Sequence, residues 1–155
     1  MSKYNRIYRV QKLCNTDDKQ LIQDLRERNL LTPLSFKGSA SLFDRHDQGA
    51  IHLGLYRESD LVCSVRINPI DHFKTELRLA FLESLYERMS GQLFCITALS
   101  AKNQLVDDVL ITRLFGDLDR EVEGMGVRGV VMLSPQHLLK TFQSMGFRLI
   151  NEAWM

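Results

Sequence analysis

The sequence predicts a mixed α/β (α+β) fold in which a central β-sheet is flanked by helices on both faces. Short β-rich apolar runs alternate along the chain with longer segments whose apolar residues recur at helical spacing. In the second half, a strand, a helix and a strand follow one another, and this order implies a right-handed crossover between parallel strands. The length of 155 residues is enough to bury one core, so we predict a single domain over residues 1–155.

The first half of the chain predicts three strands and one helix. Alternating apolar residues indicate a strand at residues 6–13, and residues 15–30 show helical spacing with acids in the first turn. Residues 50–56 and 61–67 are β-rich runs separated by the polar "RESD", which predicts an antiparallel hairpin with a four-residue connection. Pro69 is expected to end the second strand of this hairpin.

The second half predicts three helices and three further strands. They are, in order, a helix at residues 71–89, a strand at 92–100, a helix at 106–124, a strand at 129–133, a helix at 135–145 and a strand at 147–154. Pro135 suits the first turn of a helix, and Gly146 suits its end.

The composition is that of an ordinary globular protein, and it excludes several classes of partner. Lys and Arg number 20 and Asp and Glu 19, so the charge favours neither nucleic acid nor an anionic membrane as the main partner. No segment approaches the roughly 20 consecutive apolar residues of a membrane span. The polar opening lacks the apolar core of a secretory signal, so we expect a cytoplasmic protein.

The cysteines and histidines indicate neither a metal site nor a disulfide framework. Cys14, Cys63 and Cys95 are far apart, odd in number and form no CxxC pair. The four histidines also lie outside any metal-ligand spacing. We therefore predict no metal, and we interpret the cysteines as small buried apolar residues.

A polar constellation stands out in residues 43–69, "FDRHDQGAIHLGLYRESDLVCSVRINP". Asp44 and Asp47 precede two predicted strands, and Arg66 lies near the end of the second, apolar one. A charge on a buried strand must be paired or exposed, and a carboxylate is the natural partner of a planar guanidinium. Two interpretations stay open: a functional cluster with Arg66, or two aspartates that are solvated or capping in a loop.

The end of the chain, "GVRGVVMLSPQHLLKTFQSMGFRLI", resembles the GNAT acyltransferase superfamily, in which a strand of this kind leads into a helix closing with "GF". The resemblance covers the order of elements from about residue 5. It implies a V-shaped split between the two central parallel strands, at residues 93–100 and 129–133, where the acyl donor enters. A closed sheet at this place would instead fit a plain protein-interaction domain.

Within that superfamily, residues 43–69 resemble the acyl-homoserine lactone (autoinducer) synthases and the related long-chain N-acyl amino acid synthases. Asp44, Asp47 and Arg66 occupy the positions of the two aspartates and the arginine that those enzymes carry. An arginine on the first helix is also usual in that subgroup, and both Arg26 and Arg28 are candidates.

Two family motifs are incomplete in this chain. The subgroup's Glu-x-Ser-Arg corresponds to "ALSA", in which Ser100 matches but Ala98 and Ala101 replace the glutamate and the arginine. The glycine loop that holds the pyrophosphate of coenzyme A in ordinary GNAT enzymes corresponds to "KNQLVD", with Lys102 as the leading basic residue and no glycine. Autoinducer-type enzymes share this loss and often use acyl carrier protein, so the resemblance implies either acyl-CoA or acyl carrier protein as donor.

The resemblance also implies which residues carry the chemistry. Acyl transfer from a thioester needs a deprotonated amine, an oxyanion donor and a proton for the leaving thiolate. GNAT folds take the oxyanion donor from backbone amides of the strand before the crossover helix, here residues 95–100. The expected catalytic residues are Asp44, Asp47, Arg66, Ser100 and Ser134, and the expected donor-binding residues are Leu99, Ser100, Ala101, Lys102, Asn103 and Phe142.

The acid and the base are the least defined parts of this site. Thr97 and Ser100 are poor bases by themselves, and Phe142 stands where the family has a tyrosine as leaving-group acid. Ser134 and His137 are candidate substitutes, with capping or ordinary surface roles as the alternative.

We therefore predict an N-acyltransferase that moves an acyl group from acyl-CoA or acyl carrier protein to the amine of a small metabolite or amino acid. The alternative is a catalytically inactive GNAT-like module that binds an acyl donor or a protein partner.

Overall fold

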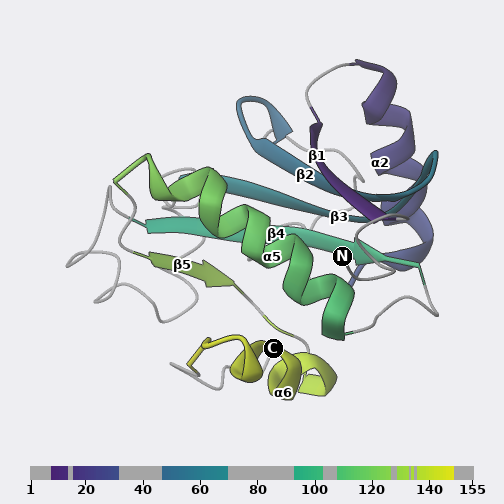
Figure 1. The fold of residues 1–155 in the computed structure, drawn as a ribbon. Helices are drawn as coiled ribbons and strands as arrows, with labels where there is room; N and C mark the ends of the chain where they lie inside the picture. The colour runs from purple at the N-terminus through teal and green to yellow at the C-terminus, as the bar shows by residue number, and fades with distance from the viewer. Residues whose placement is uncertain are drawn as a thin grey trace.

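A five-stranded mixed sheet with the order β1-β2-β3-β4-β5 is the centre of the computed structural model (Figure 1). The structure describes residues 8–13, 16–31, 47–69, 93–102, 108–126, 129–132, 134 and 136–148. Its strands are β1 Tyr8–Leu13, β2 Ile51–Arg57, β3 Asp60–Pro69, β4 Leu93–Ala101 and β5 Gly129–Met132. The strands β1 to β4 pair antiparallel, and β5 pairs parallel to β4, which confirms the predicted crossover.

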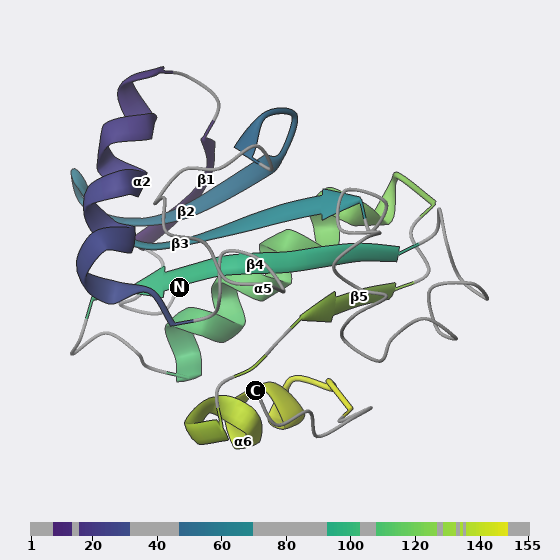
Figure 2. The same cartoon turned by 180° about the vertical axis from the view of Figure 1, so that it is seen from behind.

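Helices cover both faces of this sheet, as the sequence predicts. The helices are α2 Thr16–Asn29, α5 Asp108–Glu123, the short 3-10 helix η4 Gln136–Leu138 and α6 Leu139–Ser144. Figures 1 and 2 show α5 on one face and α2 on the other, while α6 lies beyond β5. Within the described ranges, no helix has the length and apolar character needed to cross a membrane.

One sequence prediction differs from the structure, and two others lie wholly or mostly outside the described residues. The β2–β3 connection is tighter than the predicted four residues, because Arg57 pairs with Asp60 and Glu58 adopts a left-handed φ of 55° that closes a two-residue turn. The helix predicted at residues 71–89 lies outside the described residues. Of the strand predicted at 147–154 only the first two residues are described, and neither is in a strand.

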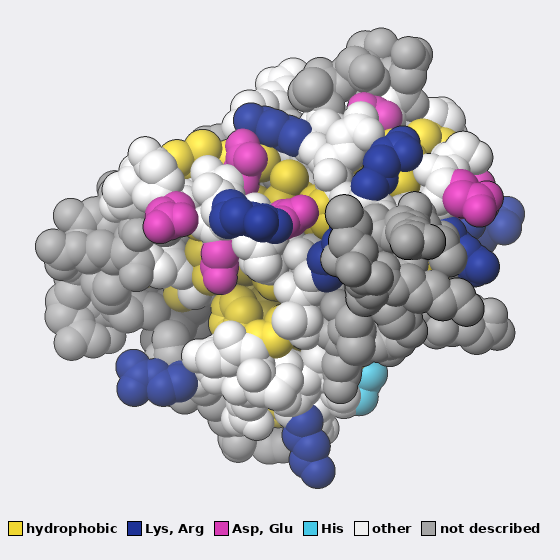
Figure 3. Space-filling view, in the orientation of Figure 1, with side chains coloured by type: hydrophobic (Ala, Val, Ile, Leu, Met, Phe, Trp, Pro, Cys, Tyr) yellow, Lys and Arg dark blue, Asp and Glu magenta, His cyan; other side chains and the backbone are white. Residues whose placement is uncertain are grey.

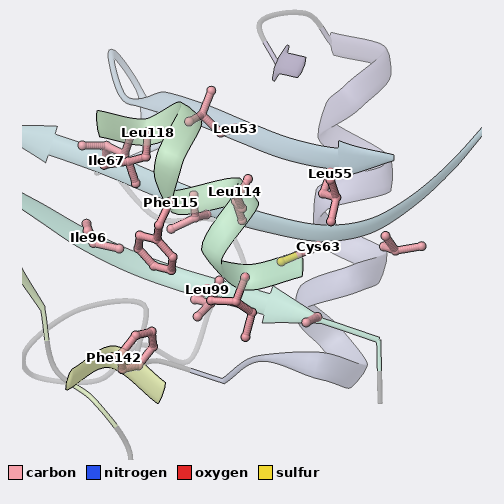
Figure 4. Packing of buried hydrophobic residues seen from close by; sticks show 14 of the residues in the cluster. Leu53, Leu55, Cys63, Ile67, Ile96, Leu99, Leu114, Phe115, Leu118 and Phe142 are labelled. Atoms are coloured by element: carbon pink, nitrogen blue, oxygen red, sulfur yellow. The ribbon is translucent and has the colours of Figure 1, made fainter. Parts of the chain in front are cut away.

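The main core lies between the sheet and α5 (Figure 4). Alternate residues of β2 and β3, such as Leu53, Leu55 and Ile67, point to this face, as the two-residue period of a strand requires. Leu114 and Leu118 from α5 are fully buried against them. The outer surface over α5 carries acidic and basic side chains interspersed (Figure 3), including an ion pair between Lys12 and Glu121 at 3.0 Å.

The α2 face has a smaller apolar cluster near β1, formed by Leu13, Ile22, Leu25, Tyr56 and Leu61. Gly54 lies beside it, and a Cβ at this position would lie 2.6 Å from Leu61 Cδ1 and 2.8 Å from Leu13 Cδ1, so both leucine side chains would have to shift. Tyr56 Oη donates a hydrogen bond to Asp18 Oδ1 at 3.2 Å. These contacts attach α2 to the sheet.

Candidate functional site

Polar side chains line the central strands on the α2 face of the sheet. His52, Arg66 and Thr97 lie opposite one another in the registers of β2, β3 and β4. They alternate along their strands with the apolar residues that face α5, so a strand's two-residue period places them on the other face. Arg66 is fully buried, which is unusual for an arginine, and Thr97 is 4% exposed.

Asp47 joins this row to α2. Its Oδ1 lies 3.0 Å from Arg26 Nη1 and 3.2 Å from Arg66 Nη1, and His52 Nε2 is 3.8 Å away. The side chains of Arg26, Arg66 and Asp47 are 1%, 0% and 7% exposed. We call Arg26, Asp47, His52 and Arg66 the Asp47 cluster.

His52 is neutral at physiological pH within this cluster. Burial lowers the pKa of the imidazole, and the nearby charge of Arg26 lowers it further. Its Nε2 lies 3.4 Å from the Asp47 carbonyl oxygen, a contact that partly opposes these two effects. The positive charges of the Asp47 cluster therefore come from Arg26 and Arg66.

A bulge interrupts β4 next to this cluster. The β3–β4 register shifts between Ser64 and Arg66, and Ala98 adopts a left-handed φ of 55°. Such a φ is unfavourable for a residue with a side chain, so contacts around it must hold it. Arg66 Nε donates a hydrogen bond to Thr97 Oγ1 at 2.9 Å, immediately before the bulged residue.

The parallel pairing of β4 with β5 stops at the same place. Ile96 lies opposite Met132, where β5 ends, whereas β4 continues to Ala101. Figures 1 and 2 show β4 continuing beyond the end of β5. The strand β5 therefore no longer pairs with this edge of β4 from Thr97 onward, as the predicted split requires.

The segment after α2 reaches β4 just beyond the bulge. Leu31 N–H donates to the Leu99 carbonyl oxygen at 2.7 Å, and Leu30 forms an isolated bridge with Ser100. Because Ser100 already faces Ser64 of β3, this bridge lies on the opposite edge of β4, which is the edge of β5. The end of α2 is thus attached beside the split.

The structure brings Asp47, Arg66 and Ser100 to one region, but the other predicted residues are distributed differently. Ser100 Oγ donates to the Ala98 carbonyl oxygen at 3.3 Å. Ser134 is half-buried just after β5, and Lys102 is exposed after β4. Asp44 and Asn103 lie outside the described residues.

Three predicted donor-binding side chains belong to the core. Leu99 and Ala101 are buried in the cluster under α5. Phe142 is 2% exposed and packs edge-to-face against Phe115 and Phe147, with ring centroids 5.8 and 5.9 Å apart. Leu99 and Ala101 can therefore contact a donor only through their backbone atoms. The Phe142 ring packs in the core.

The sequence prediction left the first-helix arginine open and missed His52 altogether. The structure places Arg26 in the Asp47 cluster, whereas Arg28 is exposed. A signal for His52 does exist, because it alternates with Ile51 and Leu53 and therefore shares the face of Arg66 across the hairpin. Side chains alternate between the two faces of a strand, so this pattern in the hairpin is enough to place His52 beside Arg66 without a sequence motif.

The chemistry of this region suits binding of polar groups. Among the residues that the structure describes, no group of three or more His, Cys, Asp or Glu side chains is placed to hold a metal ion. The strand β4 offers backbone N–H and carbonyl groups beside the split, and the α2 face offers buried guanidinium and hydroxyl groups. The helix α5 begins at Asp108, and an acid there disfavours an anion at the helix start.

This arrangement has the fold of the GNAT N-acetyltransferases. No family model and no curated protein matches the sequence. Among solved structures, an acyl-CoA N-acyltransferase from Pseudomonas aeruginosa superposes with a TM-score of 0.65 at 14% identity, over 96% of this chain and 92% of that chain. These identities are low, so the similarity establishes the fold.

Two further structures have the same fold. A glucosamine-6-phosphate N-acetyltransferase from Arabidopsis thaliana has a TM-score of 0.60 at 16% identity, over 96% of each chain. A predicted acetyltransferase from Clostridium acetobutylicum, solved with acetyl-CoA, has a TM-score of 0.61 at 11% identity, over 96% of this chain and 95% of that chain.

Proposed function

We propose that this protein is an N-acyltransferase that moves an acyl group from a thioester to the amine of a small metabolite or amino acid. The bulge at Ala98, at the point where β5 stops pairing with β4, is the observation that carries the proposal. A bulge turns backbone groups away from the regular ladder, so the N–H groups around it become available to a thioester oxygen beside the split. The fold shared with N-acyltransferases supports the same reaction.

In this reaction the neutral amine nitrogen attacks the thioester carbon and forms a C–N bond, the nitrogen loses a proton to a base, the C–S bond breaks, and the leaving thiolate takes up a proton. The N–H groups of β4 hold the carbonyl oxygen. Ser100 and Lys102, at and after the end of β4, then lie along the donor. Ser134 follows β5 on the other side of the split and is our candidate proton donor.

The Asp47 cluster supports the finer proposal that the chain is related to the autoinducer and N-acyl amino acid synthases. Asp47 and Arg66, which occupy the subgroup's positions, form an ion pair, and Arg26 supplies the helix arginine. In this proposal the cluster forms one wall of the amine site, and Asp44 extends it. The donor is then acyl-CoA or acyl carrier protein, and the protein acts in the cytoplasm as the single domain over residues 1–155.

Turnover with a panel of donors and acceptors tests this proposal. The protein is incubated with short- and long-chain acyl-CoA, or the same groups on acyl carrier protein, and with small amines and amino acids. We expect free thiol to appear and an N-acylated product to be seen by mass spectrometry. Cys63 and Cys95 add no background, because both are buried and burial raises the Cys63 pKa to about 12. No thiol release above the enzyme-free rate with any pair would overturn the proposal.

One observation favours an inactive binding module as the second candidate. The strand β4 carries no carboxylate, and its two hydroxyls on the α2 face are already engaged, Thr97 with Arg66 and Ser100 with the Ala98 carbonyl. If the protein is an inactive binding module, acyl-CoA raises its melting temperature but no product forms with any acceptor.

A further inference from the structure

We propose that Arg66 and Thr97 are positioning residues, whose hydrogen bond holds the bulge of β4 so that its backbone N–H groups face the acyl donor. This inference rests on the proposed function for its catalytic consequence. It gives Arg66 a second role, towards the backbone of β4, and adds Thr97 to the site. The hydrogen bond between Arg66 and Thr97 is present in the structure whether or not the protein is an enzyme.

The two residues are placed for this task by the sheet. Arg66 and Thr97 face each other in the register of β3 and β4, and the next residue, Ala98, has the left-handed φ of 55°. Arg66 Nε donates to Thr97 Oγ1 at 2.9 Å in a buried environment, where a lost hydrogen bond is not replaced by water. The bond therefore fixes the side chain, and with it the backbone, immediately before the bulge.

Arg66 is itself held by the rest of the Asp47 cluster. Its Nη1 lies 3.2 Å from Asp47 Oδ1, which also lies 3.0 Å from Arg26 Nη1 of α2. The guanidinium thus contacts Asp47 with one nitrogen and Thr97 with another, and its planar geometry makes the two contacts dependent on each other. A chain of contacts runs from α2 through Asp47 and Arg66 to the bulge.

The other side of the bulge is held by the same end of α2. The hydrogen bond from Leu31 N–H to the Leu99 carbonyl oxygen follows Ala98 directly. Ala98 is therefore enclosed between two contacts that both lead back to α2, one through side chains and one through the backbone. With both in place, the backbone around the bulge has one orientation before the donor arrives, which is the condition for preorganised oxyanion binding.

A matched pair of substitutions at Thr97 tests the inference. Thr97→Val keeps the shape but removes the acceptor of Arg66 Nε, whereas Thr97→Ser keeps the hydroxyl. We expect the backbone amide signals of Ala98 and Leu99 in a ¹H–¹⁵N spectrum to move in the valine variant and to stay near their wild-type positions in the serine variant. We also expect kcat to fall about tenfold or more in the valine variant, with KM for the donor little changed.

A second variant keeps the test decisive if valine at residue 97 prevents folding. Arg66→Lys retains a cation beside Asp47 but lacks the Nε donor, so the same amide signals should move. Unchanged Ala98 and Leu99 signals in Thr97→Val or in Arg66→Lys would overturn the inference. A wild-type protein without turnover would overturn the proposed function instead, while the amide signals still decide whether the hydrogen bond holds the bulge.

Discussion

At the scale of single residues, Asp47 is a buried carboxylate that contacts two buried guanidinium groups. Removing such charges from water is costly, and only close geometry with hydrogen bonds compensates for it. Arg66 meets this condition through Asp47 on one side and Thr97 on the other. The neutral state of His52 limits the positive charge of the cluster, because a protonated imidazole there would repel both arginines.

We predict that His52 makes the folded protein less stable in mild acid. Burial and the charge of Arg26 lower its pKa in the folded state, while the unfolded chain has a histidine pKa of about 6.5. As the pH falls below about 6.5, His52 is protonated in the unfolded state before it is protonated in the folded state. The stability contributed by neutral His52 is therefore complete above about pH 6.5 and is lost as the pH falls towards the folded-state pKa.

Urea unfolding at about pH 7.5 and at about pH 5.5 checks this prediction. The wild-type free energy of unfolding should fall more between the two pH values than that of His52→Gln. His137→Gln removes a histidine from an exposed position and is the matched control. An equal fall for His52→Gln and the wild type would show that His52 does not titrate differently in the two states.

At the scale of the elements, the Asp47 cluster attaches the last turns of α2 to the middle of the sheet. The apolar contacts of α2 are made by Ile22 and Leu25, from the middle of the helix onward, beside β1. The last turn adds Arg26, and the segment after the helix adds the backbone contact of Leu31 with β4. A change in Asp47 should therefore loosen the end of α2 and the edge of β4 together.

We predict that Asp47→Ala lowers the free energy of unfolding by about 3 to 5 kcal/mol, because two buried guanidinium groups lose this carboxylate. Denaturant unfolding measures the loss, and Asp47→Asn serves if the alanine variant does not fold. Asp24→Ala is the control, because Asp24 is an exposed residue of the same helix that accepts a hydrogen bond from nearby Gln20. A loss no larger than that of the control would contradict the role of Asp47.

The sequence predicted the described elements well where their periodicity is local. The strand at 92–100 and the helix at 106–124 agree with β4 and α5 apart from small differences at their ends. The turn after β2 was predicted too long, because the left-handed φ of Glu58 is not encoded by a glycine or an asparagine. The bulge at Ala98 was missed for the same reason, since alanine gives no sign of a left-handed conformation.

At the scale of the whole molecule, a cluster of Asp47 with Arg66 is one of two interpretations that the sequence leaves open, and its burial beneath α2 is not predicted. The spacing of a motif in the sequence indicates which residue types belong to one site. Whether Arg26 or Arg28 contacts Asp47 depends instead on which face of α2 packs on the sheet. Thr97 was noted only as a poor base, because its contact with Arg66 joins residues 31 positions apart. Contacts of this range follow from strand register and become visible only in the assembled sheet.

The central claim is that an acyl thioester binds at the opening of β4, and an NMR titration tests it most directly. Acyl-CoA, or the same acyl group on acyl carrier protein, is added to ¹⁵N-labelled protein while the backbone amide signals are followed. We predict the largest shifts for Thr97 to Ala101 beside the split, with little change for β1 at the far edge of the sheet. If neither donor moves the signals of Thr97 to Ala101, or if the largest changes lie in β1, the claim is wrong.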